Sequence, residues 1–577
     1  MRFPTERSGL GWMTIPKMLE RSAETYRDEL ALSMRGKEGF RRFTYGELFD
    51  IVKRLALRLK DLGLGKGDRA SVVGENRPEW AMAYLAIHWA GGVAVPLDPK
   101  LTVHEWKHIL QDAEVKIVIS SGRMVSDFLD IKEDLKTLKH VISMDDNGEA
   151  ESLGSILARY KKGAPRPDTS LEGLAVILYT SGTTGTSKGV MLTHKNIMSN
   201  VDSIYQCIDY GPGDKFFSVL PLHHVFEATA GFLTPLYGGA AIVYARSLKS
   251  RDLREDLIHC KPTVMLVVPL LLEKILGGLH REIRKASPIK KSFFYLLKGA
   301  SKALKPLLRD ASPRILFKSI REKMGFGNLR YMVSGGAALP VWVGKGMREL
   351  GFPLLQGYGL SETSPVLTLT PPSRPKLESV GLPIPHVDIK IVNPDENGVG
   401  EIAARGPNVM KGYYKNEEAT REVLTEDGWF LTGDLGYIDE EGFLYLTGRK
   451  KSVIVTRGGK NIYPEEVESV LLQSPYIEEV LVLKGINPTS GDEEIQAIVY
   501  PNYENVDSYF AEKRKSNPSE DDVLALISQE VTRLSRRLAP YKRPRRITLR
   551  EEEFPKTTTK KIKRFLFEKP FKEIGEK

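Results

Sequence analysis

The stretch LAVILYTSGTTGTSKGV, residues 174–190, indicates both the fold class and the chemistry of this chain. Its first seven residues, 174–180, are apolar enough for a buried strand. Residues 181–189 then combine three glycines with several hydroxyl side chains and Lys188. Glycines let backbone N–H groups converge, hydroxyls add donors and the lysine adds positive charge, so the pattern is typical of a nest for phosphate oxygens. A flexible surface turn is the alternative that glycine, serine and threonine alone would favour.

The sequence around this stretch predicts an α/β protein. Ser187 precedes Lys188 where a Walker A loop requires glycine, so the loop is of another kind. Thr44-x-x-Glu47 and Thr102-x-x-Glu105 are capping boxes that open helices. A further helix is predicted over 77–90, and strands are predicted at 70–75, 91–98 and 115–120. This alternation favours layered α/β subdomains with mainly parallel sheets.

The C-terminal part of the chain, from residue 433 on, has a different pattern of predicted elements. GDLGYIDEEGFLYLTGR, residues 433–449, predicts a turn-rich β segment. A small α+β unit with helices near Pro464 and over 521–538 is expected after it. We therefore predict a large N-terminal domain, 1–450, with a β-rich part, and a small mobile C-terminal domain, 451–577.

Composition favours a cytoplasmic protein. The longest apolar run, 264–272, is far shorter than the ~20 residues of a spanning helix, and the N-terminus has no apolar segment of signal-peptide length. Cys207 and Cys260 match no metal or redox spacing. The net charge is +10, and residues 280–325 hold thirteen lysines and arginines against three acidic residues. That excess raises the question of an anionic partner.

Six motifs in order resemble those of the adenylate-forming superfamily, which includes acyl-CoA synthetases, amino-acid adenylation domains and luciferases. The motifs are YTSGTTGTSKGV (179–190), SGGAALP (334–340), QGYGLSET (356–363), TGD (432–434) with GR (448–449), RGGKNIYPEEVE (457–468) and PKTTTKKIKR (555–564), and the resemblance as a whole runs from residue 40 to 565. Relatives activate a carboxylate with ATP, giving an acyl-adenylate and pyrophosphate, and then transfer the acyl group to a thiol, usually of CoA.

The resemblance implies an ATP site with Mg²⁺. The residues implied to hold the β- and γ-phosphates are Thr180, Ser181, Gly182, Thr183, Thr184, Gly185 and Lys188. Those implied for the rest of the nucleotide are Gly335, Gly336, Ala337, Gln356, Gly357, Tyr358, Gly359, Ser361, Asp434 and Arg449. Tyr358 would lie against adenine, and Asp434 would accept hydrogen bonds from the ribose. Glu362 would bind Mg²⁺, and Thr180, Glu362 and Lys561 would form the catalytic set.

The resemblance also implies an acyl site, a CoA site and a hinge. His224, Gly335 and Gly359 would line the acyl pocket, although His224 as an ordinary core histidine is the alternative. His223 and His224 are expected on a strand with opposed side chains, which argues against a shared metal. The loop implied for CoA comprises Arg457, Gly458, Gly459 and Lys460, and Lys451 matches the hinge position.

The last motif carries the implied catalytic lysine. Relatives have glycine before this lysine, whereas this chain has Lys560, so Lys561 falls on the catalytic position and would bind ATP and the carboxylate. Lys560 is the alternative. Loss of the glycine removes easy access to positive φ, so the loop is expected to be stiffer or differently shaped.

Residues 264–325 resemble the expansion of the long-chain fatty-acid branch. Ser287-Pro288 and Ser312-Pro313 predict two helix starts with serine caps. The first helix has an apolar stripe and lysines lying largely away from it: Phe293, Leu296, Leu297, Ala300, Ala303 and Leu304, with Lys291, Lys298, Lys302 and Lys305. Such a helix suits an anionic membrane surface. The alternative is an ordinary surface helix packed on the body.

The leading prediction is therefore a long-chain fatty-acid–CoA ligase using ATP, Mg²⁺ and coenzyme A. Activation of a medium-chain or aromatic acid, or transfer to acyl carrier protein, stays open. No insertion like that of fatty acyl-AMP ligases is seen between Asp434 and Gly459. A basic nucleic-acid-binding protein is disfavoured because no reading motif is present. A peripheral location on the inner face of the membrane and a homodimer are left open.

Overall fold

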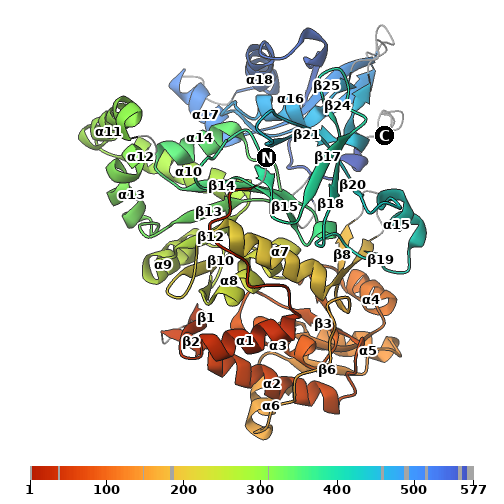
Figure 1. Cartoon of the computed structure of the whole chain (residues 1–577). Coiled ribbons are helices and arrows are strands. Elements are labelled where there is room, and N and C mark those ends of the chain that lie inside the picture. Colours follow the sequence, from red (N-terminus) through yellow and green to blue (C-terminus); the bar gives the residue numbers. More distant parts are fainter. Residues whose placement is uncertain are drawn as a thin grey trace. The chain divides into compact units, whose positions relative to one another are not determined.

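The computed structural model describes residues 3–36, 39–146, 148–181, 187–308, 311–455, 461–486, 493–513, 518–556 and 562–567 (Figure 1). The chain forms two compact units. Unit 1 comprises 1–389, 403–431 and 439–444, and unit 2 comprises 390–402, 432–438 and 445–577. Each unit has its own apolar core.

Unit 1 contains an eight-stranded sheet that carries the loop motif. Its strands, in spatial order, are β19 (Gly412–Tyr413), β9 (Ser187–Thr193), β8 (Leu174–Ser181), β4 (Val93–Leu97), β3 (Arg69–Val73), β5 (Val115–Ser120), β6 (His140–Ser143) and β7 (Glu151–Ser152). From β8 to β7 neighbours are parallel. The pairs β8–β9 and β9–β19 are antiparallel, so the loop motif joins two strands of a hairpin.

Unit 1 also contains a nine-stranded sheet. Its order is β16 (Leu382–Pro383), β15 (Val366–Leu369), β14 (Leu354–Gly359), β13 (Tyr331–Ser334), β12 (Val264–Val267), β10 (Lys215–Ser218), β11 (Ala241–Tyr244), β1 (Leu30–Arg35) and β2 (Phe40–Thr44). The strands from β14 to β1 are parallel, and the outer ones are antiparallel. The predicted fold class of mainly parallel sheets is confirmed.

Helices pack between the two sheets and share one core with both: α1 (Ile15–Thr25), α2 (Tyr45–Asp61), α3 (Pro78–Trp89), α7 (His194–Cys207), α8 (Thr234–Gly238) and a π-helical turn, η2 (Glu227–Leu233). Every residue of α3 except Glu79 is buried, as expected for a helix covered on all sides. The other face of the eight-stranded sheet is covered by α4 (Val103–Asp112) and α5 (Val125–Asp134). Both predicted capping boxes, at Thr44 and Thr102, are present.

The remaining helices of unit 1 are α6 (Leu153–Arg159), α9 (Ser250–Cys260), α10 (Pro269–Lys285), α11 (Pro288–Leu308), α12 (Ala311–Leu316), α13 (Lys318–Lys323), α14 (Val341–Glu349) and α15 (Glu417–Val423). The cap predicted at Ser312 is wrong, because α12 already begins at Ala311. The Ser312 hydroxyl instead donates to the carbonyl of Ser301, 3.0 Å away, and so joins α12 to α11.

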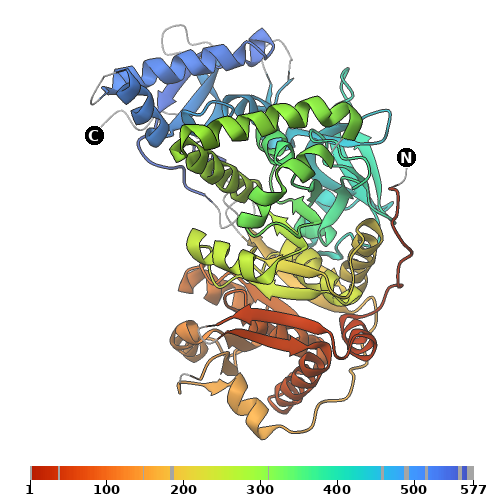
Figure 2. The same ribbon diagram turned by 90° about the vertical axis from the view of Figure 1, so that its left-hand side faces the viewer.

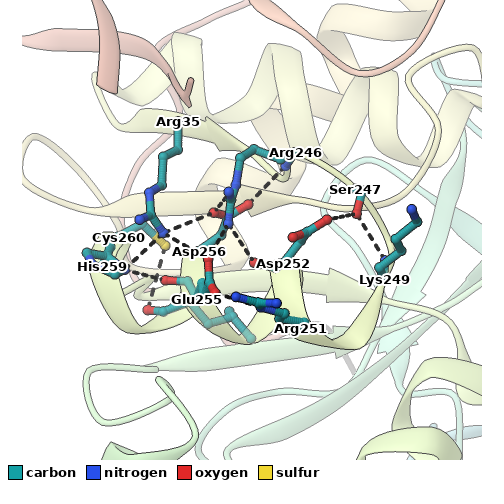
Figure 3. Close-up of polar contacts among 11 residues, drawn as sticks. Arg35, Arg246, Ser247, Lys249, Arg251, Asp252, Glu255, Asp256, His259 and Cys260 are labelled. Atoms are coloured by element: carbon teal, nitrogen blue, oxygen red, sulfur yellow. Dashed lines mark hydrogen bonds and ion pairs between the residues drawn. The ribbon is translucent and has the colours of Figure 1, made fainter. Parts of the chain in front are cut away.

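An ion-pair cluster fixes α9 against the sheet (Figure 3). The buried Asp256 of α9 accepts from the Arg246 side chain at 2.7 Å and from the Arg246 backbone N–H at 3.0 Å. Arg35, at the end of β1, lies 3.9 Å from the same carboxylate. A buried carboxylate needs such partners, so the cluster holds α9 beside the ends of β1 and β11.

Unit 2 contains a three-stranded sheet in the order β24 (Ile477–Ile486), β25 (Glu493–Pro501) and β26 (Arg546–Leu549). Its core is shared with α16 (Pro464–Leu471), α17 (Tyr503–Glu512) and α18 (Glu520–Ser535). The pair β22 (Ile454–Val455) and β23 (Asn461–Ile462) also belongs to unit 2. A four-stranded sheet, β17 (Asp388–Val392), β18 (Gly400–Arg405), β20 (Phe430–Ile438) and β21 (Leu444–Arg449), has residues assigned to both units, and 390–392, 400–402, 432–438 and 445–449 belong to unit 2. The boundary at residue 450 stays a prediction.

Candidate functional site

The strands on either side of the loop motif place its lysine. In the β8–β9 hairpin Thr180 lies opposite Lys188, and Ser181 lies opposite Ser187. Gly182, Thr183, Thr184 and Gly185 lie outside the described residues. The Lys188 ammonium lies 5.0 Å from the centre of the Tyr413 ring, which belongs to the next strand, β19. An ammonium over a ring face is an attractive cation–π contact.

Glu362 contacts the same tyrosine through the phenol hydroxyl. It lies in a short 3-10 turn, Ser361–Thr363, directly after β14, and it is only partly buried. The Tyr413 hydroxyl donates to Glu362 Oε1 at 2.9 Å. Burial and the nearby carboxylate raise the pKa of Tyr413, so the hydroxyl keeps its proton and remains a donor. Tyr413 therefore joins the candidate phosphate lysine to the candidate metal ligand.

Sequence reasoning missed Tyr413. It stands 51 positions from Glu362, and no motif or spacing connects the two. Their contact arises because β19 pairs with β9, and the backbone N–H of Met410 just before β19 donates to the Glu362 carbonyl at 2.8 Å. Only the sheet order reveals this link.

The two glycine-containing motifs of the nucleotide side extend from neighbouring parallel strands. Ser334, the last residue of β13, pairs in register with Gln356 of β14. Gly336 has φ +79°, which favours glycine, and is exposed together with Ala337. The Gln356 amide donates to the backbone carbonyls of Leu377 and Ser379, at 2.6 and 3.2 Å, so its side chain fixes the loop that follows β15.

Two of the motif positions are glycine because neighbouring atoms lie too close for a side chain. A Cβ on Gly359 would lie 1.8 Å from the carbonyl oxygen of Pro365, so no side chain fits there without moving backbone. A Cβ on Gly335 would lie 2.9 Å from the ring of Phe226. Tyr358 and Gly335 are buried, whereas Gly357, Gly359 and Ser361 are partly exposed. Gly335 thus contacts the segment that carries the histidine pair.

The histidine pair lies in a turn after β10, not on a strand, so the prediction of opposed side chains is wrong. The ring centres of His223 and His224 are 4.3 Å apart. His223 Nε2 lies 3.5 Å from Asp98 Oδ2, slightly beyond a normal hydrogen bond. Burial opposes ionisation of Asp98, but the adjacent His223 side chain lowers its pKa to about 2. Burial, and then the charge of His223, lower the pKa of His224 to about 3, so His224 is neutral at pH 7.

Glu227 adds an unexpected group to this region. It opens the π-helical turn three residues after His224 and is 1% exposed. Neither carboxyl oxygen meets a hydrogen-bond partner among the residues that the structure describes. Burial raises the pKa of Glu227 to about 8, and a smaller effect of the Ser218 hydroxyl opposes it. The side chain is therefore a neutral acid at pH 7.

Unit 2 brings together the two candidate ribose residues. Arg449 Nε lies 2.8 Å from Asp434 Oδ1, and Asp434 is buried while Arg449 is exposed. Lys451 lies exposed in the short turn that follows, Lys450–Ser452. The Lys450 ammonium is held by Glu401 at 2.7 Å.

The described residues at both ends of the last motif are held by contacts within unit 2. Lys556 and Ile562 form an antiparallel bridge, and Lys556 is ion-paired with Glu479. Arg564 pairs with Glu468, whose other oxygen accepts from the Val482 N–H at 2.7 Å. Lys561, Lys560, Arg457, Gly458, Gly459 and Lys460 lie outside the described residues.

Comparisons with known proteins give relatives over most of the chain. The family model described as AMP-binding enzyme matches residues 19–414, and that of the AMP-binding enzyme C-terminal domain matches 466–561. A long-chain-fatty-acid–CoA ligase of Bacillus subtilis is 30% identical, covering 96% of this chain and 93% of that protein. A chloroplastic long-chain-fatty-acid–[acyl-carrier-protein] ligase of Arabidopsis thaliana is 28% identical, covering 90% and 80%. The crystal structure of ATP-bound MatB from Rhodopseudomonas palustris has a TM-score of 0.76 at 26% identity, covering 98% and 100%.

Proposed function

Because this chain belongs to the AMP-binding enzyme family, we infer that it is an AMP-forming long-chain fatty-acid–CoA ligase. A fatty-acid carboxylate attacks the α-phosphorus of ATP and expels pyrophosphate. The CoA thiol then attacks the acyl carbon of the acyl-adenylate and expels AMP. The structural observation that carries the proposal is the joint placement of Lys188 and Glu362 around Tyr413.

The first step brings two anions together, so positive charge is required where negative charge accumulates. We propose that Lys188 and the loop residues Thr180 to Gly185 hold the β- and γ-phosphates. The position of Lys188 at the start of β9, opposite Thr180, supports this because both flank the loop. Each donor placed at the transition state contributes roughly 10²–10³ in rate.

Mg²⁺ is proposed as the metal, with Glu362 as its protein ligand. Mg²⁺ is commonly held by one or two carboxylates together with substrate phosphates, which fits a single partly exposed carboxylate at this position. When bound, the ion would act as a Lewis acid on the phosphates. The Tyr413 hydroxyl orients this carboxylate by donating to Oε1.

The remaining roles are proposals that follow the family motifs. Tyr358 would lie against adenine. The Asp434–Arg449 pair would present its carboxylate to the ribose, as its 2.8 Å contact supports. His224 would face the acyl chain as a neutral ring, which its lowered pKa supports.

The C-terminal part would serve both half-reactions in turn. We propose that Lys561 reaches the carboxylate and α-phosphate in the first, and that residues 457–460 approach CoA in the second. Lys451 would be the hinge, and its exposed position in a short turn supports this because the backbone can turn there without breaking a core. The domain division at residue 450 belongs to this proposal.

The thiol acceptor separates the proposed function from its main alternative, since one relative is named as an acyl-carrier-protein ligase. ATP–pyrophosphate exchange should depend on palmitate, and the purified protein should then form palmitoyl-CoA with free CoA. Thioester formation with acyl carrier protein but not with CoA would overturn CoA as the proposed acceptor. Pyrophosphate exchange with an aromatic or medium-chain acid but not with palmitate would overturn a long-chain fatty acid as the proposed substrate.

A peripheral location at the inner face of a membrane is also proposed. In the described part of the chain no helix combines the length and apolarity that crossing a bilayer requires. The exposed apolar side chains of α11 support a peripheral contact instead. A homodimer stays a prediction.

A further inference from the structure

The helix α11 exposes large apolar side chains to solvent. Ile289, Phe293 and Leu296 are 82%, 59% and 68% exposed. They recur at i, i+4 and i+7, which places them on one face of the helix. Leu304 is exposed further along the same face. Of the apolar stripe read from the sequence, Phe293, Leu296, Ala303 and Leu304 are therefore exposed, whereas Leu297 and Ala300 are half-buried.

A different face attaches α11 to the body. Phe294 and Ser301, seven residues apart, are buried. The ring of Phe294 packs against that of Phe317, with centroids 5.6 Å apart, and the Ser301 carbonyl accepts from Ser312. α11 is thus packed on the body, as the sequence alternative of an ordinary surface helix expects, but through Phe294 and Ser301 rather than through Phe293 and Leu296.

The exposed apolar side chains gather in this region. Of the seventeen large apolar side chains that are exposed in the described residues, six lie between 289 and 315. Scattered exposed apolar residues are normal, but a contiguous group marks an interaction site. Figure 1 shows α10–α13 at the left edge, and Figure 2, viewed from that side, shows these helices in front.

Positive charge accompanies the apolar face. Residues 280–325 carry an excess of ten positive charges over negative ones. Lys290 and Lys302 of α11 are exposed, whereas Lys298 is paired with Glu349 at 2.7 Å. A helix with apolar residues on one face and lysines on the rest is typical of segments that lie in the boundary of an anionic bilayer.

We propose that α11 docks this enzyme on an anionic lipid bilayer, with Ile289, Phe293 and Leu296 entering the headgroup boundary. Charge complementarity decides the partner, because a second copy would bring the same positive excess to the contact and be repelled. The role of this surface rests on the proposed function, since long-chain acids partition into bilayers. Docking itself is a separate property that needs no catalysis.

The test is co-sedimentation of the full chain with phosphatidylcholine vesicles, with and without phosphatidylglycerol. The wild-type chain should bind the anionic vesicles, and salt should weaken binding. The variant Ile289→Ser/Phe293→Ser/Leu296→Ser should bind at least tenfold more weakly. Its control, Val103→Ser/Leu248→Ser/Ile258→Ser, removes three other exposed apolar side chains (46%, 66% and 41% exposed) and should bind as the wild type does.

A second pair of variants tests the charge. Lys290→Glu/Lys291→Glu/Lys302→Glu should lose binding by at least tenfold, because each lysine near an anionic surface contributes about fivefold. Lys132→Glu/Lys136→Glu/Lys139→Glu changes the net charge equally on another surface and should keep binding.

The outcomes separate docking from catalysis. Both α11 variants should keep ATP–pyrophosphate exchange with a soluble short acid, which shows that they fold. The proposal would be overturned if the apolar α11 variant bound vesicles as the wild type does, or if the control variants lost as much vesicle binding. It would also be overturned if the chain self-associated instead of binding vesicles. Loss of palmitate activation with intact vesicle binding would overturn only the proposed function.

Discussion

Replacement of Glu227 by glutamine should stabilise unit 1, and increasingly so as the pH rises. Burial raises the pKa of this carboxyl from 4.5 to about 8. Below pH 4.5 both the folded and the unfolded chain hold the proton, so ionisation of Glu227 does not affect stability. Between pH 4.5 and 8 only the folded chain holds it, so the free energy of unfolding falls as the pH rises. Above pH 8 both states are ionised, so the loss in free energy of unfolding is complete and no longer changes with pH.

The size of the effect follows from the same values. One pKa unit corresponds to 1.36 kcal/mol, so a rise of about 3.5 pKa units costs the wild type on the order of 5 kcal/mol above pH 8. Glutamine has nearly the same shape and no charge, so Glu227→Gln avoids this cost. The melting temperature of the variant should exceed that of the wild type by about 5 °C at pH 9, and by little at pH 5.

The assay is thermal unfolding of both proteins from pH 5 to pH 9 at one scan rate. Glu79→Gln is the matched control. Burial opposes ionisation of Glu79, but the charge of Arg77, 2.8 Å away, lowers its pKa, so it is ionised in both states across this range. Its variant should therefore be less stable by a constant amount. A difference for Glu227→Gln that is equally flat from pH 5 to 9 would refute the reasoning.

The other predictions concern the reaction. Tyr413→Phe keeps the ring under the lysine but removes the hydrogen bond to Glu362. A hydrogen bond to a charged group contributes about 1.5–3 kcal/mol, so its loss should raise the apparent Kd for Mg-ATP about tenfold or more. An unchanged magnesium titration would contradict this. Lys561→Ala should slow adenylate formation by roughly 10²–10³ while sparing thioester formation from supplied acyl-adenylate. If Lys560→Ala has that effect instead, the register of the motif is wrong by one residue. Lys451→Pro fixes φ near about −65° and should slow the thioester step more than adenylation, and single-turnover rates that fall equally would rule out the hinge.

Local sequence patterns predicted the elements of this fold well. The capping boxes at Thr44 and Thr102, and the strand at 115–120, are governed by side chains within a few residues of each other. The alternation of such elements was sufficient for the α/β class. Ser312 shows the limit, because whether a serine caps a helix or bonds to a neighbouring helix depends on packing that no local pattern contains.

The candidate site was predicted in part for the same reason. Motifs singled out Lys188 and Glu362 as candidates, and their roles stay predictions, but Tyr413, which contacts both, depends on the pairing of β19 with β9. Glu227 resembles any acidic residue in the sequence, and its raised pKa results from its place between the two sheets. The stripe on α11 was recognised, yet periodicity alone cannot say which face of a helix meets the protein.

The order of the strands explains why the candidate site gathers where it does. In parallel α/β sheets, ligands bind beyond the carboxyl ends of the strands. The motifs at 334–340 and 356–363 leave β13 and β14, which are adjacent, parallel and in register, at that edge of the nine-stranded sheet. The loop motif and Tyr413 belong to the antiparallel strands at one side of the other sheet. The hydrogen bond from Tyr413 to Glu362 thus joins the two sheets at the candidate metal position, so a change in either sheet that moves β19 should alter magnesium binding before it alters the fold.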